Sequence, residues 1–555
     1  MKRLSFLVVT LVALATLGAC GGPQEEAIKP GDIATVPNPQ VTRKVTSGDV
    51  AFELPPVEVK GVIYEPSALD RPGMPLVQAK RATTKDKQRA LVQSSKDPVA
   101  KQAQAAILAT MLYLETKNES PEKARDKYKE ARDLLRDVAQ QVGDKQIDEI
   151  TLRLLGSYEI ILAADDKRAD EQQKGYAAAE KAWADLIDKD PKAKEVAESR
   201  AWLAYAQLRQ FKNAEALTSV GTDKLDEKEP ELAYVTAWAK LRAGDGGGAW
   251  QAIAVAARGW GQRTRHDDLE REVLWFAGRT NTAPEQAVSL ITGALAKATL
   301  QQYELIAKLG LSGYAGAGRW AAGVAALERA VSLAGAVVPP NDLPVIRYSE
   351  ADFSVRLDAP DAAAKYAKQA LDALDACGSK CTAKDKADTT QGVYLMGRLF
   401  HILYATANDH TYYEPAHQLY DLTIPKLDPT NQAQAQNDLK KLETTLRNMK
   451  VGTGTHDKSA LGALLPRHNV EIQACYEQVL MTNRKLVGTV AVNLESDATG
   501  AIKGVSTEPK AGAADLSAVA GCAAERAKAW KLTKRGMPGN TRIKVPFALS
   551  LAKSN

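Results

Sequence analysis

Histidine is scarce in this 555-residue chain, and the residues that usually carry catalysis form no known pattern. The six histidines match no His-Glu-x-x-His or other metal-ligand spacing, and no Gly-x-Ser-x-Gly turn is present. Three of them, His401, His410 and His417, fall around one predicted helix pair, where packing is the commoner use of histidine. The glycine-rich run at 452–456 follows a predicted helix instead of joining a strand to a helix, so it is a poor phosphate-binding loop. The sequence therefore predicts no catalytic residue, no metal site and no cofactor, and we expect a protein that is not an enzyme.

Aromatic residues and net charge are low as well. Aromatics make up 6% of the chain while alanine is abundant, which suits closely packed helices better than one large globular core. The formal net charge of +5 would fall to +3 without Lys2 and Arg3, and it gives no indication of nucleic-acid binding. Residues 463–555 hold 13 Lys and Arg against 7 Asp and Glu. These extra basic side chains either bind an anionic partner or, in our preferred interpretation, are solvated at a helix end, where the helix dipole favours positive charge.

The N-terminal residues read as a targeting segment. A positive start is followed by an apolar run over residues 4–17 that is too short for a good membrane span. The next residues, Leu17-Gly18-Ala19-Cys20, resemble the lipobox of bacterial lipoproteins. That resemblance implies a signal peptide at 1–19 and a diacylated Cys20, and Gly21 in place of aspartate favours an anchor in the outer membrane, on its periplasmic face. The alternatives are an ordinary secretory signal with an incidental cysteine, or an anchor in the inner membrane or at the cell surface.

Residues 20–95 are rich in proline, glycine, valine and charge, and they show no sustained helical period. This composition predicts a Pro-rich, lipid-anchored tether. For residues 60–95 an irregular cap packed on the first helices is an open alternative.

Residues 96–450 are predicted to be nearly all helical and to repeat. Within 301–335, an aromatic, a turn glycine and alternating small and large residues are spaced as in a tetratricopeptide repeat: Tyr314, Gly318, Gly323, Leu327 and Ala330. Small residues suited to a helix crossing recur at Ala124, Ala179, Ala214, Ala249, Ala287, Gly323, Ala363 and Ala416. The six central positions lie 35 to 40 residues apart, and the outer intervals of 55 and 53 predict an extra helix or a long loop. The resemblance implies a mainly α, tetratricopeptide-like solenoid with a concave surface for protein segments, and an irregular α-solenoid is the alternative.

The C-terminal residues 466–555 change character after a predicted linker at 451–465. A helix, an alternating strand from Val487, a turn, a second strand, another helix and a last strand give an α+β order. Matches at Cys475-Tyr476, Gly488-x-Val490-x-Val492, Gly500, Cys522, Trp530 and Val545-Pro546-Phe547 resemble the TonB-like C-terminal domain of the AgmX/PglI type. Members of that type belong to envelope machines of gliding myxobacteria. One departure is KLTKRGMP after the tryptophan, where a Phe-Pro pair is usual, so the turn there is in doubt.

The resemblance also pairs two cysteines. Cys475 and Cys522 match a cysteine pair of that domain, and a bridge between them would contribute about 4 kcal/mol by loop closure. Cys377 and Cys381 lie at a helix end, where a local bridge is favoured over metal binding, because no second ligand pair is near in sequence.

These features predict a non-enzymatic envelope scaffold or adaptor lipoprotein, with a membrane anchor, envelope proteins as partners, and a gliding-motility or related complex as its setting. TonB-like domains dock by adding a strand to a sheet edge, and we expect that edge at Lys544, Val545, Pro546, Phe547 and Ala548. A cell-wall enzyme activator and a lipoprotein-trafficking chaperone are the alternative functions.

Overall fold

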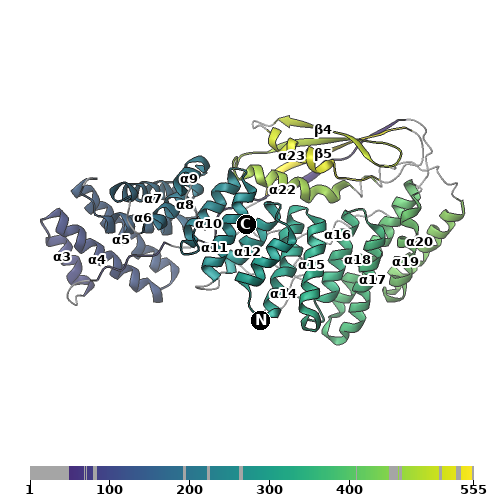
Figure 1. Cartoon of the computed structure of the whole chain (residues 1–555), viewed down its shortest axis with the longest axis horizontal. Coiled ribbons are helices and arrows are strands. Elements are labelled where there is room, and N and C mark those ends of the chain that lie inside the picture. The colour runs from purple at the N-terminus through teal and green to yellow at the C-terminus, as the bar shows by residue number, and fades with distance from the viewer. Residues whose placement is uncertain are drawn as a thin grey trace. The chain divides into compact units, whose positions relative to one another are not determined.

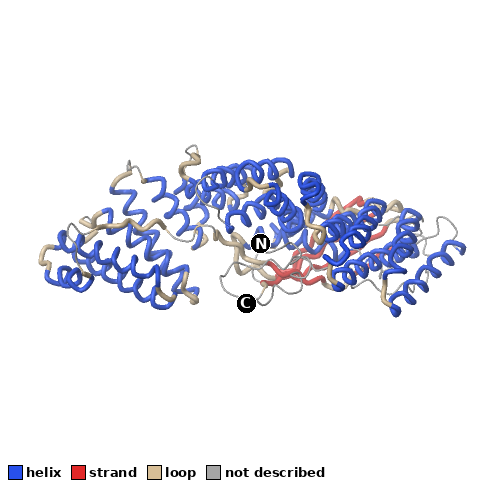
Figure 2. The backbone as a smooth tube through the Cα atoms, turned by 90° about the horizontal axis from the view of Figure 1, so that it is seen from below, coloured by secondary structure: helices blue, strands red, loops and turns tan. Residues whose placement is uncertain are grey.

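The structure is a computed structural model that describes residues 49–552 apart from 68, 70–71, 79–83, 145, 192–194, 222–224, 262–266, 408, 449–460, 462–464, 512–515 and 533–538. The chain forms two compact units, residues 65–273 and residues 1–64 with 274–555. Figures 1 and 2 show their helices and the single sheet. The predicted signal peptide, the lipidation site Cys20 and most of the predicted linker lie outside the described residues.

Helices of the repeat region follow one another in antiparallel pairs, and seven of the eight predicted small residues are buried on the second helix of a pair. Ala214 lies on the expected helix but is exposed, and Ala216 is buried there instead. The mainly α repeat fold is therefore confirmed. In the unit of residues 65–273 the helices are α3 (Lys85–Ser94), α4 (Pro98–Glu115), α5 (Pro121–Val142), α6 (Glu149–Ala164), α7 (Ala169–Lys189), α8 (Val196–Arg209), α9 (Asn213–Val220), α10 (Pro230–Arg242), α11 (Gly246–Gly261) and the first half of α12 (Asp267–Arg279).

The other unit continues the pairs from the second half of α12. Its repeat helices are α13 (Pro284–Leu290), α14 (Thr299–Lys308), α15 (Trp320–Ala334), α16 (Leu343–Arg356), α17 (Pro360–Cys377), α18 (Ala383–Ala407), α19 (Tyr413–Thr423) and α20 (Pro429–Asn448). Among the described residues, the long outer intervals show neither an extra α-helix nor a long loop, because longer helices fill them: α5 has 22 residues, α7 has 21 and α18 has 25.

The pair α14 and α15 shows why small residues are needed. A Cβ at Gly310 would lie 2.8 Å from the Leu327 side chain and 3.0 Å from the Gly323 carbonyl oxygen, so these two segments cross in close contact. Gly318 ends the first segment with a φ of 67°, a left-handed conformation that favours glycine. Tyr314 is fully buried, as its place in the pattern predicts.

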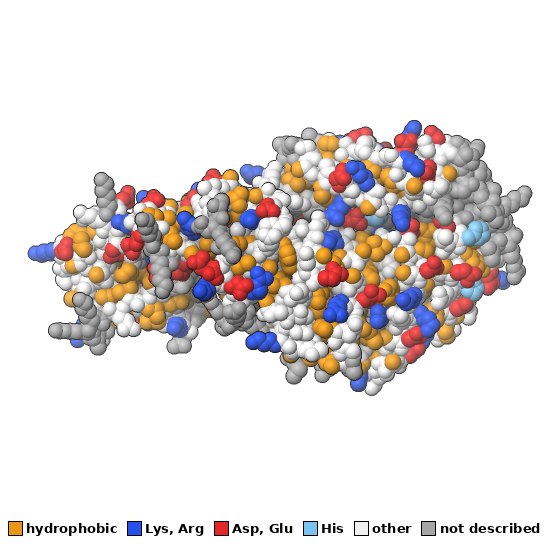
Figure 3. All heavy atoms as spheres, in the orientation of Figure 1, with side chains coloured by type: hydrophobic (Ala, Val, Ile, Leu, Met, Phe, Trp, Pro, Cys, Tyr) orange, Lys and Arg blue, Asp and Glu red, His pale blue; other side chains and the backbone are white. Residues whose placement is uncertain are grey.

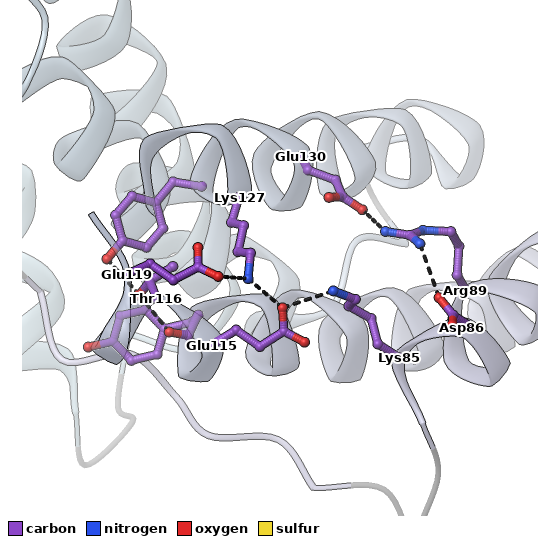
Figure 4. A network of polar contacts seen from close by, with 10 residues as sticks. Lys85, Asp86, Arg89, Glu115, Thr116, Glu119, Lys127 and Glu130 are labelled. Carbon is purple, nitrogen blue, oxygen red and sulfur yellow. Dashed lines mark hydrogen bonds and ion pairs between the residues drawn. The ribbon is translucent and has the colours of Figure 1, made fainter. Parts of the chain in front are cut away.

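Part of the sequence predicted as tether is structured in the described residues. Helix α3 packs on α4 and is joined to it and to α5 by a polar network (Figure 4). Glu115 accepts from Lys85 at 2.9 Å and from Lys127 at 2.6 Å, and Arg89 pairs with Glu130. The lysine hydrogen bonds hold the pKa of Glu115 below its ordinary value. Because these groups are partly exposed, the network orients α3 more than it stabilises the fold.

The C-terminal residues form the predicted α+β unit, but two strands of its sheet come from the N-terminal side of the chain. The sheet order is β1-β5-β3-β4, with β2 also paired to β5. Strands β1 and β2 run parallel to β5, whereas β3 is antiparallel to both β4 and β5. The elements are β1 (Val50–Glu53), β2 (Val57–Gly61), α22 (Asn469–Leu480), β3 (Gly488–Ser496), β4 (Ile502–Ala511), α23 (Ser517–Ala527) and β5 (Thr541–Leu551).

Both predicted cysteine pairs are disulfides. Cys475 on α22 is bonded to Cys522 on α23 across a sequence separation of 47 residues, and Cys377 is bonded to Cys381 at the end of α17. The first bridge lies in the core of the terminal domain, where Cys475 is packed among buried apolar residues of the sheet and both helices. It therefore fastens the two helices that cover this sheet.

Candidate functional site

The most distinctive surface of the unit 65–273 is already covered by an extended segment of the same chain. We call residues 65–78 the strap, of which 65–67, 69 and 72–78 are described. The described residues of the strap have no regular secondary structure. Its hydrogen-bonding and ion-pair partners lie on α4, α8 and α12, each the first helix of its pair. The first helices of this unit therefore form a surface that holds an extended peptide.

A buried carboxylate fixes the strap at one end. Ser67 donates its backbone N–H and its hydroxyl to Oε1 of Glu272, at 2.8 and 2.6 Å. The other oxygen, Oε2, accepts from the Tyr234 hydroxyl at 2.7 Å and from the Trp238 indole at 2.9 Å. Burial raises the pKa of Glu272, and the four hydrogen bonds oppose that shift. One oxygen is thus held by the helices and the other by the strap.

Arg209 binds the strap just before Ser67, at Glu65. The Glu65 carboxylate lies 2.8 Å from Nη2 of Arg209, whose guanidinium lies 5.0 Å from the ring centre of Tyr176. Two residues after Ser67, Leu69 is 6% exposed, so the strap also buries an apolar side chain. The acidic and hydroxyl groups of the strap therefore each have a polar partner on the helices, and its apolar side chain is buried.

The far end of the strap lies along α4. The Val77 N–H donates to the Thr110 hydroxyl oxygen at 3.2 Å, and Met74 and Val77 pack against the core of α4, α5 and α6. Leu76, by contrast, is 56% exposed. Contacts at both ends thus hold the strap along the first helices.

In the other unit, the terminal domain is seated on the repeat helices around Glu471 of α22. Its Oε1 accepts from the Trp320 indole of α15 at 3.1 Å, and its Oε2 accepts from the Trp530 indole at 2.6 Å. His468 lies 3.0 Å from Oε1 and stacks on Trp530, with ring centres 4.3 Å apart. Burial disfavours ionisation of Glu471, but the His468 and indole contacts outweigh it, and the pKa is lowered. This carboxylate joins the repeat helices to the terminal domain.

A second carboxylate on α22 repeats this arrangement. Glu477 and Arg279 form a buried ion pair at 2.7 Å, with side chains 2% and 8% exposed. The other oxygen of Glu477 accepts from the Val62 N–H, which follows β2, at 3.3 Å. Two buried acids on one helix therefore bind the repeat helices, the terminal domain and the N-terminal strands into one unit, as Figure 1 shows for α22 above α15 and α16.

The predicted docking edge is wrong, because β5 is a central strand. Lys544 pairs with Asn493 of β3 on one side and with Glu53 of β1 on the other, and Ala548 pairs with Thr489 and Glu58. Val545, Pro546 and Phe547 lie between these positions, and the break between β1 and β2 falls opposite Val545 and Pro546. Proline, which cannot donate to the ladder, is tolerated at such a break. A proline at 544 or 548 would disrupt the sheet itself, and the long edge strand is β4.

The basic excess of the terminal domain is offset locally. Lys544 pairs with Glu508, Lys503 with Asp497, and Arg542 with Glu495. Figure 3 shows basic and acidic side chains intermixed on the visible face of this domain. This distribution favours solvated charge over a site for one polyanion.

The histidine cluster is a packing feature. His401 is 2% exposed within the core of α16–α20, and its Nδ1 lies 3.2 Å from the Tyr420 hydroxyl. His417 pairs with Asp421 on the same helix. Among the described residues, no three His, Cys, Asp or Glu side chains gather as metal ligands would. Within the same residues, every helix is too short or too polar to cross a bilayer.

Buried His401 makes the stability of the fold depend on pH in the acidic range. Burial lowers its pKa from 6.5 to about 4, so the unfolded chain binds this proton more readily between those values. Stability is therefore lost as pH falls from about 6.5 toward 4. We expect His401→Gln to reduce the loss of unfolding free energy between pH 7 and 4.5 by about 2 kcal/mol, measured by guanidinium unfolding. Identical pH dependence in both chains would contradict this, since their carboxylates are the same.

Comparisons with known proteins identify no family. No protein-family model and no curated protein matches the chain. Among solved structures, a signal transduction ATPase with a tetratricopeptide repeat sensor from Pyrococcus horikoshii aligns with 67% of each chain at 10% identity, with a TM-score of 0.19. A circular tandem repeat protein of novel repeat topology aligns with 72% of this chain and 93% of its own at 13% identity, with a TM-score of 0.15. These likenesses are too weak to carry an argument, so the fold assignment rests on the helix pairs described above.

Proposed function

We propose that this protein is a non-enzymatic scaffold of the bacterial envelope that binds extended protein segments on the first helices of residues 65–273. The observation that carries the proposal is the strap, because a surface that fixes one extended segment through Glu272, Arg209 and Thr110 has the groups that peptide recognition needs. The terminal domain, fixed by Glu471 and Glu477, acts as an adaptor with β4 as its open edge.

The envelope setting is part of this proposal and depends on the lipobox-like LGAC sequence at 17–20. It assigns a lipid anchor on Cys20 in the outer membrane and, through the AgmX/PglI-type resemblance of the terminal domain, a gliding-motility or related complex. An anchored scaffold also agrees with a chain that lacks a recognisable catalytic pattern.

In-cell photocrosslinking tests the proposal. Probes are placed at Leu76 on the strap, which is 56% exposed, and at Lys503 on β4, whose side chain is 61% exposed, with Lys181 on α7 as a control at 68%. We expect one or two envelope proteins from Leu76 or Lys503, none from Lys181, and loss of capture when Cys20→Ala releases the chain from the membrane. Glycan or many unrelated clients would contradict the scaffold and favour the cell-wall or chaperone function.

A further inference from the structure

The strap occupies the surface that the proposed function assigns to partners, and its contacts are those of a ligand. Oε1 of Glu272 receives both of its strap hydrogen bonds from Ser67, while the helices provide the donors to Oε2. If the strap left, a buried carboxylate oxygen would lose two donors, which is costly unless a replacement brings an N–H and an O–H to the same place. The surface is therefore built to be covered.

We propose that the strap, through its described residues 65–67, 69 and 72–78, is an internal ligand that a partner's extended segment of similar chemistry displaces. The inference rests on the proposed function and specifies its ligand. The required groups, in order, are a carboxylate for Arg209, then a serine or threonine for Glu272 one position after a buried proline, then an apolar residue two positions later. In this chain they are Glu65, Pro66, Ser67 and Leu69.

The covalent attachment of the strap makes it a strong competitor of any partner segment for this surface. It is joined to β2, which ends at Gly61, and to α3, which begins at Lys85, so it is always near its site and has a high effective concentration. Only a partner segment with better contacts or high local concentration would replace it. Binding is thereby restricted to partners that match the acidic, hydroxyl and apolar order.

The test uses a fluorescein-labelled synthetic peptide of residues 62–78 and the purified full chain, with binding read by fluorescence anisotropy. A strap-weakened chain carries Ser67→Ala and Leu69→Asp, which remove the Glu272 contact and the apolar anchor. A matched control carries Leu76→Asp on the exposed side of the strap. We expect the strap-weakened chain to bind the peptide at least tenfold more tightly than the unmodified chain and the control, because its own segment no longer competes.

The second comparison changes the peptide and leaves the protein sequence as it is. A peptide with Ser67→Ala loses the hydroxyl hydrogen bond to a charged acceptor, so we expect about tenfold weaker binding, whereas Leu76→Ala should bind as before. If the double substitution prevents folding, as judged by circular dichroism, the chain with Ser67→Ala alone replaces it. That chain should still bind the peptide more tightly than the unmodified chain and the control, by a smaller factor.

The proposal is overturned if a folded strap-weakened chain does not bind the peptide, or binds the Ser67→Ala peptide equally well. It is also overturned if weakening the strap produces dimers that excess peptide dissociates, because the occupant would then be a second copy. Capture from Leu76 in cells together with absent peptide binding would leave the scaffold function standing and remove only the ligand assignment.

Discussion

Replacing Glu471 with alanine is expected to lower the free energy of unfolding of the unit that holds the terminal domain by about 3 to 5 kcal/mol, the usual cost of removing one partner from a buried charged contact. The change leaves the indoles of Trp320 and Trp530 and the ring of His468 without their common acceptor. Because one indole belongs to α15 and the other to the terminal domain, we expect the two parts to separate before either unfolds.

Guanidinium unfolding followed by tryptophan fluorescence measures this effect, since two tryptophans flank the carboxylate. Limited proteolysis should release the terminal domain from the variant at protease levels that leave the unmodified chain intact. Glu525→Ala is the matched control, because that glutamate is 71% exposed and pairs with its helix neighbour Lys528. A loss below about 1 kcal/mol, or equal losses in both variants, would refute the role given to Glu471.

Removal of the Cys475–Cys522 disulfide is expected to have an effect of similar size. The bridge spans 47 residues, and loop closure over that length corresponds to about 4 kcal/mol. Cys475→Ala with Cys522→Ala should therefore lower the unfolding free energy of the terminal domain by roughly that amount, measured by denaturant unfolding at constant pH.

The local Cys377–Cys381 bridge is the matched control, since its separation of 4 residues corresponds to only about 2 kcal/mol by the same estimate. Its removal should affect the helical unfolding transition and not the terminal domain. Equal losses from both bridges would contradict the loop-length argument.

Local sequence predicted the elements whose contacts are local. Gly318 and the small residue Gly323 were placed correctly because a helix turn and a close helix crossing each demand one residue type within a short window. The order of strands and helices after residue 466 followed from alternation and from turn residues for the same reason.

The pairing of strands that lie far apart in the sequence could not be predicted from such short stretches. Strands β1 and β2 are 4 and 5 residues long and are separated by two prolines, so they read as tether, and their partner β5 lies more than 480 residues further on. Whether β5 is an edge or a central strand depends on that distant pairing. This is why the predicted docking residues Lys544 and Ala548 were wrong.

The buried acids were missed for a related reason, although a signal existed. Glu272 directly precedes the apolar run VLWF on α12, and Glu471 lies between Val470 and Ile472 on α22. A charge in such a position indicates a specific partner, but its identity depends on the strap in one case and on two tryptophans in the other.

The pairing of β1 and β2 with β5 also sets an order of events during synthesis. Residues 50–61 are made long before the strand that they join, at 541–551. Until then the backbone groups of both early strands lack their β5 partner, and the sheet can close only after residues 541–551 have been made. A chain truncated before β5 would therefore leave β1, β2 and β3 without the strand with which all three pair.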